Sequence, residues 1–151
     1  MKSALPMDRK KVVCVSGFFD PIHSGHLAYF KEAAKYGELV VILNSDDAAK
    51  RKKGYVFLPY QERKEIIEEL RCVSRVEPVD DGDGTVVKAL ARIRPDYFAK
   101  GGDRGPGNTP EQEACGHLGI EMLWAIGGTE KKQSSSRLVA DSWDSLLGWL
   151  Q

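Results

Sequence analysis

A ten-residue segment of the chain carries residue types suited to holding phosphate groups. It runs from Gly17 to His26 and reads G-F-F-D-P-I-H-S-G-H, between a short apolar run and a helix-like pattern. Gly17 allows a tight turn and a close approach of the backbone, and the first turn of a helix points N–H groups toward an anion. His23 and His26 lie three residues apart across that helix start. Both imidazoles can therefore donate hydrogen bonds to phosphate oxygens on one side.

Five apolar runs, separated by polar loops, predict the scaffold around this segment. They occupy residues 12–15, 39–43, 73–79, 97–99 and 120–126. Helix-like patterns fall between or after them, at 26–36, from Pro59 onward, at 86–94, at 109–118 and from Ser134 to the end. This alternation predicts an α/β fold: a Rossmann-like, doubly wound parallel sheet of about five strands with helices on both faces.

The chain shows no linker that would divide it, so we expect one domain over residues 1–151, with 1–10 as a flexible N-terminal extension. Residues 44–58 are expected to form a polar connection. Thr85 is expected to cap the helix predicted at 86–94. The last helix has an apolar face that includes Trp143. We expect this face to cover the core, with a partner protein as the alternative.

Composition excludes several classes of function. The chain has 22 basic and 22 acidic residues and no formal net charge, whereas nucleic-acid and acidic-membrane binders usually show a basic excess. The three cysteines are scattered without a C-x-x-C pair, which argues against a disulfide framework and a structural zinc site. No apolar run reaches the length of a signal peptide or a membrane span. A cytoplasmic protein that binds neither nucleic acid nor membranes is expected.

The segment from Gly17 to His26 resembles the G-x-F-D-x-x-H-x-G-H signature of the cytidylyltransferase-like nucleotidyltransferases at all six defined positions. The resemblance extends from about Val12 to Leu138 and is strongest to ADP-heptose-type sugar-phosphate adenylyltransferases and glycerol-3-phosphate cytidylyltransferases. Four further stretches carry it, and their order agrees with the family: Asn44-Ser45-Asp46, Pro59-Tyr60-Gln61-Glu62-Arg63, residues 95–103 (P-D-Y-F-A-K-G-G-D) and residues 133–138 (Q-S-S-S-R-L).

The resemblance implies a set of site residues. His23, His26 and Lys53 are the implied catalytic residues. The implied nucleotide-binding residues are Gly17, Phe18, Phe19, Asp20, Gly25, Lys100, Gly102, Asp103, Gln133, Ser134, Ser135 and Ser136. The implied substrate-binding residues are Asn44, Asp46, Lys52, Arg63 and Arg104. The implied cofactor is Mg²⁺ on the phosphates of the nucleotide, and Asp20 would orient either the loop or the metal ion.

Plainer interpretations of these residues stay open. The histidines could merely cap a helix, and Asp20 could be an Asx-turn residue. Lys52 and Lys53 could belong to a solvated charged loop, and Arg63 could be an ordinary surface residue. The three serines could cap the last helix, which is compatible with phosphate binding because a capped N-terminus is also an anion site.

The reaction implied by the family joins an NTP and a phosphorylated acceptor and releases pyrophosphate. ATP with a sugar phosphate is favoured, because Asn44-Ser45-Asp46 and the K-G-G-D stretch look like those of adenylyl-transferring members. CTP with a polyol or sugar phosphate is the first alternative, an adenylyltransferase for FMN- or NMN-type cofactor precursors the second, and a nucleotide-binding sensor or scaffold the third. The family also implies a homodimer. Residues 127–133 lack the arginine of the R-T-E-G-I-S-T-T form, which leaves the acceptor open.

Overall fold

The computed structural model describes residues 9–102, 105–128 and 133–151. The predicted N-terminal extension falls largely on residues 1–8, and the predicted site residues Asp103 and Arg104 also lie outside the described residues.

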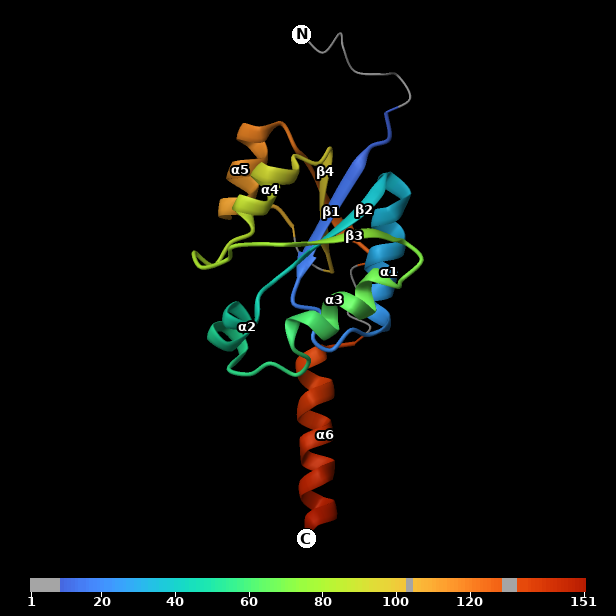
Figure 1. Ribbon diagram of the computed structural model, residues 1–151, viewed down its shortest axis with the longest axis vertical. Helices are drawn as coiled ribbons and strands as arrows, with labels where there is room; N and C mark the ends of the chain where they lie inside the picture. The colour runs from blue at the N-terminus through green and yellow to red at the C-terminus, as the bar shows by residue number, and fades with distance from the viewer. Residues whose placement is uncertain (1–8, 103–104, 129–132) are drawn as a thin grey trace.

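A five-stranded, all-parallel sheet forms the centre of the molecule (Figure 1), in the order β3-β2-β1-β4-β5. The strands are β1 (Val12–Gly17), β2 (Glu38–Leu43), β3 (Val73–Pro78), β4 (Tyr97–Gly101) and β5 (Glu121–Ile126). The helices are α1 (Ser24–Ala33), followed by a 3₁₀ turn (Ala34–Tyr36), α2 (Asp46–Lys53), α3 (Tyr60–Glu68), α4 (Val87–Ile93), α5 (Pro110–Leu118) and α6 (Ser135–Leu150). The predicted fold class is confirmed.

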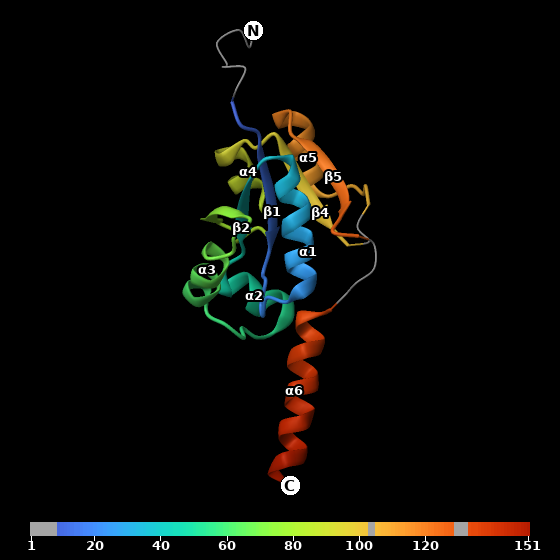
Figure 2. The ribbon, with the colours of Figure 1, turned by 90° about the vertical axis from the view of Figure 1, so that its right-hand side faces the viewer.

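Alternating residues of β1 show how the two faces of the sheet are covered. Val13 and Val15 pack in the cluster that contains Phe30 of α1 and Ile67 of α3. Cys14, between them, packs in the other cluster with residues of α4 and α5. Successive side chains of a strand point to opposite faces, so a run that is apolar at every position needs a helix layer on each side. Figures 1 and 2 show these two layers.

The structure changes two expectations about local elements. Residues 44–58 are not only a polar connection, because α2 forms within them. Ser45 begins that helix by accepting a hydrogen bond from the Ala48 N–H, and Gly54 ends it in the left-handed conformation. Helix α4 begins one position later than predicted: Val86 is its N-cap residue and makes no side-chain hydrogen bond, while the Thr85 hydroxyl accepts one from the Val87 N–H at 3.3 Å. Apolar periodicity could not predict α2, because its only buried residues are two alanines.

The prediction that the last helix covers the core is wrong. Helix α6 has no buried residue, and the exposed fractions of Trp143 and Trp149 are 58% and 80%. Figures 1 and 2 both show α6 extending away from the sheet. Both faces of the sheet are already covered by the other helices. The apolar periodicity therefore predicted that a helix forms, but not that the helix would lie away from the sheet. Within the described residues, no helix has the length and apolar character needed to cross a bilayer.

Candidate active site

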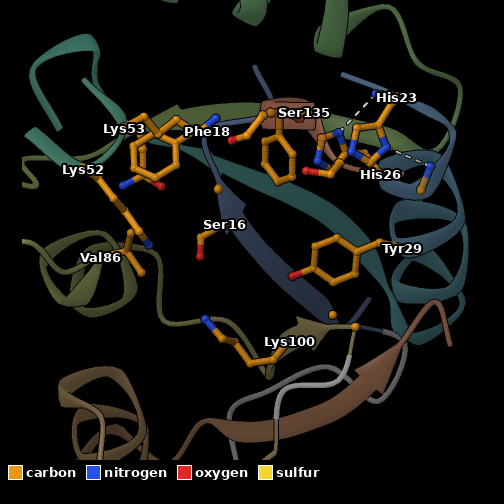
Figure 3. A pocket seen from close by; sticks show the side chains of 18 of the residues that line it. Ser16, Phe18, His23, His26, Tyr29, Lys52, Lys53, Val86, Lys100 and Ser135 are labelled. Carbon is orange, nitrogen blue, oxygen red and sulfur yellow. Dashed lines mark hydrogen bonds between the residues drawn. The ribbon is translucent and has the colours of Figure 1, made fainter. Parts of the chain in front are cut away.

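A cavity of about 690 Å³ lies at the carboxyl ends of the strands, and Figure 3 shows it from close by. Ser16 and Gly17 at the end of β1 contribute to its lining, as do Gly101 at the end of β4 and Ile126 at the end of β5. The chain crosses from one face of the sheet to the other next to β1, between β3 and β4 in sequence. Ligands of open α/β sheets bind at such a reversal of strand order.

Most of the residues predicted to bind ligands line this cavity. Those that do are Gly17, Phe18, Phe19, His23, Gly25, His26, Asn44, Lys52, Lys53, Lys100, Gly102, Gln133, Ser134, Ser135 and Ser136. Of the remaining described residues, Asp20, Asp46 and Arg63 lie outside the lining, each with protein partners of its own. The cavity therefore gathers segments that lie more than a hundred residues apart in the chain.

His23 is the N-cap residue of α1 and His26 lies in its first turn. Each imidazole accepts a hydrogen bond from a backbone N–H group of this helix start. The Nδ1 atom of His23 accepts a hydrogen bond from the Gly25 N–H at 3.0 Å. The Nδ1 atom of His26 accepts one from the N–H of His23 at 3.1 Å. A neutral imidazole that accepts at one nitrogen carries its proton on the other. Both rings are therefore the tautomer whose Nε2–H is a donor, as a site for phosphate oxygens requires.

The ring of His26 stacks on that of His23 and is uncharged at neutral pH. The centroids of His23 and His26 are 3.7 Å apart, with an angle of 20° between the planes. Burial, and after it the electrostatic effects of His23 and Lys53, lowers the pKa of His26 to about 3. The ring of Phe19 meets His26 edge-on at a centroid distance of 4.9 Å. His26 is thus a neutral hydrogen-bond donor at neutral pH, not a cation.

Gly25 is required by the close approach of the His23 ring. A Cβ atom added at Gly25 would lie 2.9 Å from Cε1 and 3.0 Å from Nδ1 of His23. Heavy atoms at that distance clash, so any larger residue would displace the imidazole from its position beside His26. The glycine between the two histidines is therefore part of the donor geometry.

Asp20 orients a loop, which was one of its two predicted roles. Its side chain is fully buried, and its two carboxylate oxygens accept hydrogen bonds from the N–H groups of Phe57 and Leu58 at 2.7 and 2.6 Å. Both oxygens are thus used to hold the α2–α3 loop, and Asp20 does not fit the role of a magnesium ligand. Among the described residues, no group of three or more His, Cys, Asp or Glu side chains is placed to bind a metal ion.

The wall contributed by α2 is cationic. Lys52 and Lys53 line the cavity, and each places its Nζ atom over the ring of Phe18, at 5.7 and 5.4 Å from the centroid. Lys53 also donates to the backbone carbonyl of Asp20 at 3.3 Å. Burial lowers the pKa of Lys53, and the charges of Arg63 and Lys52 act in the same direction against that of Asp20. Figure 3 shows both lysines across the cavity from the histidines.

Arg63 does not reach the cavity, so the prediction that it binds substrate is wrong. It is 1% exposed, and its guanidinium donates to the backbone carbonyls of Leu58, Phe18 and Asn44 at 2.8–3.0 Å. Its Nη2 atom also meets the carboxylate of Asp46 at 2.6 Å. Asp46 in turn accepts from the Tyr60 N–H, so it also serves the framework rather than the substrate. The partners of Arg63 are therefore three carbonyl groups and one carboxylate of the protein.

The start of α6 closes the histidine end of the cavity. The Ser134 side chain accepts from the N–H of Arg137 and so caps the helix. The Ser135 hydroxyl donates to the Pro21 carbonyl at 2.7 Å, which joins this helix start to the loop that precedes α1. The first turns of α1 and α6 therefore meet at one site, and N–H groups at helix N-termini favour anions.

Sequence reasoning missed several residues of the lining. Tyr29 lies one turn after His26 on α1, and its hydroxyl donates to the carbonyl of Ala99. Arg51, Asp81 and Glu111 also line the cavity. The signal for Tyr29 was its position on the histidine-bearing face of the helix. Arg51 could have been found from its position in the basic run with Lys52 and Lys53, whereas no local pattern marks Asp81 or Glu111, which the fold brings to the cavity.

Comparisons with known proteins agree with this geometry. Residues 14–137 match the family described as cytidylyltransferase-like. The chain is 36% identical over 125 residues to the bifunctional protein HldE of Yersinia pestis, and equally to that of Yersinia pseudotuberculosis. These matches cover 81% of this chain but 24% of the relatives, so the chain spans about a quarter of their length.

Solved structures give the same result. The lipopolysaccharide core biosynthesis protein from Thermoplasma volcanium is 30% identical, with a TM-score of 0.67 over 78% of this chain and 95% of the other. A candidate nicotinate-nucleotide adenylyltransferase from Vibrio parahaemolyticus is 14% identical, with a TM-score of 0.54 over 87% of this chain and 86% of the other, and it shares the fold. With its signature segment at the centre of the cavity, the chain belongs to the cytidylyltransferase-like family of nucleotidyltransferases.

Proposed function

We propose that this chain transfers a nucleotidyl group from an NTP to a small phosphorylated acceptor and releases pyrophosphate. The stacked pair of His23 and His26 carries this proposal, because it sets two neutral donors at a helix N-terminus across a cavity from Lys52 and Lys53. Such a site offers hydrogen bonds and positive charge to phosphate oxygens. Family membership supports the same reaction class.

The reaction is a displacement at the α-phosphorus of the nucleotide. An oxygen of the acceptor phosphate attacks and forms a new P–O bond, while the bond to the oxygen that bridges toward the β-phosphorus breaks. Pyrophosphate leaves with that electron pair. The acceptor phosphate is already an anion and needs no general base, so the protein contributes positioning and charge stabilisation.

The residues divide this work in a defined way. The Nε2–H groups of His23 and His26 are assigned to the α-phosphate and the leaving pyrophosphate. Lys53, with its lowered pKa, is assigned to the charge that develops between the two substrates. Ser134 and its neighbours at the start of α6 hold the triphosphate. Lys100 and Gly102, at the end of β4, are assigned to the base and ribose.

ATP and a sugar phosphate are the favoured substrate pair. The stretch from Lys100 to Gly102 and Asn44, which belong to the segments that resemble adenylyl-transferring members, line the cavity. The likeness to a protein named for lipopolysaccharide core biosynthesis supports a sugar acceptor. CTP with a polyol phosphate is the second candidate, favoured by the name of the matching family. Magnesium is proposed to enter as the metal–NTP complex, since Asp20 is committed to the Phe57 and Leu58 amides.

The setting of the reaction is also a proposal. A cytoplasmic location is supported by Cys14, Cys72 and Cys115, all of which are free thiols. A homodimer is supported by the exposed apolar side chains of Trp143, Leu146 and Leu150 on α6, which a second copy could cover. Sedimentation equilibrium over a range of concentrations measures the oligomeric state directly.

A pyrophosphate-release assay tests the proposed function. ATP, CTP, GTP and UTP are each combined, in the presence of Mg²⁺, with sugar, polyol and cofactor-precursor phosphates. The account predicts pyrophosphate that depends on both substrates, with the highest rate for ATP and a sugar phosphate. A Lys50→Gln variant serves as the matched control, since Lys50 belongs to the same basic run but not to the cavity lining. Nucleotide binding without turnover of any acceptor would support a sensor instead.

A further inference from the structure

Asp81, in the loop after β3, contacts both ends of helix α2. Its carboxylate accepts hydrogen bonds from the Ser45 hydroxyl at 2.6 Å, the Ser45 N–H at 2.9 Å and the Asn44 amide at 3.0 Å, all immediately before α2. Its backbone carbonyl accepts one from Nη2 of Arg51 at 2.9 Å, in the last turn of the helix. Asp81 is 4% exposed and lines the cavity itself. Burial raises its pKa, but these hydrogen bonds outweigh burial and hold the pKa below its usual range.

Helix α2 has little apolar surface to hold it in place. It reads D-D-A-A-K-R-K-K, and Ala48 and Ala49 are its buried residues. Residues 50–53 are all cations, which repel one another and prefer water. Two methyl groups supply only about 1–2 kcal/mol of burial. Its position in the molecule therefore depends on polar contacts with neighbouring loops.

The position of α2 decides where the cations of the cavity lie. Arg51, Lys52 and Lys53 all line the cavity from this helix. Misplacement of charged groups by about 1 Å at a reacting centre can cost about a hundredfold in rate. A second contact, from Asp46 to Arg63 and the Tyr60 N–H, holds the first turn of α2 against α3. Loss of the Asp81 contacts should therefore loosen the helix without unfolding it.

We propose that Asp81 is a positioning residue for nucleotidyl transfer, which fixes both ends of α2 and so sets where Lys52 and Lys53 meet the phosphates. The proposal rests on the proposed function of the cavity. It assigns to Asp81 an effect on the reaction through α2, without contact with the reacting atoms.

The test compares Asp81→Asn with Asp80→Asn. The amide of Asp81→Asn keeps the shape of the side chain but directs an N–H toward the donors of Ser45. Asp80 is its exposed neighbour, paired with Lys88 at 2.9 Å, and is the matched control. We expect kcat/KM for the acceptor to fall about ten- to a hundredfold in Asp81→Asn and to stay within about twofold in Asp80→Asn. Ser45→Ala, which removes the shortest of the contacts, should change kcat/KM in the same direction, and Asp81→Glu should recover part of the loss.

A second measurement does not depend on turnover. The rate at which an acylating reagent labels Lys53, followed by mass spectrometry against pH, reports the pKa of that amine, with exposed Lys50 as the internal reference. The pKa of Lys53 should rise toward its ordinary value in Asp81→Asn and Ser45→Ala but not in Asp80→Asn.

Two results would overturn the proposal. One is an Asp81→Asn enzyme with unchanged kcat/KM. The other is a loss of activity with unaltered Lys53 titration and a lower melting temperature, which would make Asp81 a stability residue only. If the wild-type chain turns over no acceptor, the proposed function fails. The Lys53 titration still decides in that case whether Asp81 positions α2.

Discussion

The two walls of the cavity are built in different ways. The histidine wall comes from one continuous segment, in which the Gly25 N–H fixes His23 and the backbone of His23 fixes His26. The α2 wall depends on contacts between α2 and two distant loops. Asp81 accepts hydrogen bonds from Ser45 and Arg51, and the backbone carbonyl of Asp20 accepts one from Lys53. One wall is fixed by local backbone geometry, and the other by contacts that span 30 residues or more.

This difference separates the reaction from its specificity. Donors fixed by their own backbone suit the step that any member of the family must catalyse. Cations on a weakly buried helix can be repositioned by changes in the neighbouring loops, which suits the recognition of different acceptors. We infer that the histidine wall and Lys53 govern kcat, and that the rest of the α2 wall governs the KM for the acceptor.

The largest expected effect comes from removing a donor of the histidine wall. His23→Ala and His26→Ala should each lower kcat by about 10²–10³, as loss of one preorganised donor typically does. The Gln variants should recover part of the loss, because an amide N–H can replace the Nε2–H of a neutral ring. Steady-state pyrophosphate release measures both. A Gln variant as inactive as the Ala variant would show that the ring acts in some other way than as a donor.

The second expected effect comes from Gly25→Ala. The added Cβ would press on the His23 ring and should lower kcat by about ten- to a hundredfold. Gly116→Ala in α5 is the control, since a Cβ there meets no atom within 4 Å. It should leave kcat unchanged and raise the free energy of unfolding by about 0.5–1 kcal/mol, measured by urea denaturation. Full activity of Gly25→Ala would mean that the position of His23 is not critical.

A smaller effect is expected from the α2 wall. Lys52→Gln should raise the KM for the acceptor about three- to tenfold, because a half-solvated cation contributes modestly to phosphate binding, and kcat should change little. Lys50→Gln, outside the lining, should leave both constants unchanged. A large fall in kcat for Lys52→Gln would erase the proposed distinction between the two walls.

The smallest expected effect on activity is that of pH. Because the pKa of His26 is lowered to about 3, its titration should change kcat/KM by less than about twofold between pH 5.5 and 8. Stability should respond differently. The unfolded chain binds a proton near pH 6.5 while the folded chain does not, so the free energy of unfolding should fall as pH drops from 6.5 toward 3. Comparing urea denaturation of wild type and His26→Gln over that range isolates the contribution of this ring.

The sequence was sufficient for the fold and for the histidine wall. Apolar runs covered on both sides gave the parallel sheet, and a signature fixed by local hydrogen bonds gave His23, His26 and Gly25. It was insufficient for Asp81 and for α2, because a polar helix held by distant loops leaves no periodic pattern. Arg63 was misread for a related reason, since its residue type does not reveal whether its partners are a ligand or carbonyl groups of the protein.

The stereochemistry of transfer tests the central claim most directly. An NTP with a chiral thiophosphate at the α position is turned over with the best acceptor, and the configuration of the product is determined by phosphorus NMR. A single in-line displacement, with the two histidines acting only as donors, predicts inversion at the α-phosphorus. Retention would require two displacements through a nucleotidyl-enzyme intermediate, and would contradict the role assigned here to His23 and His26.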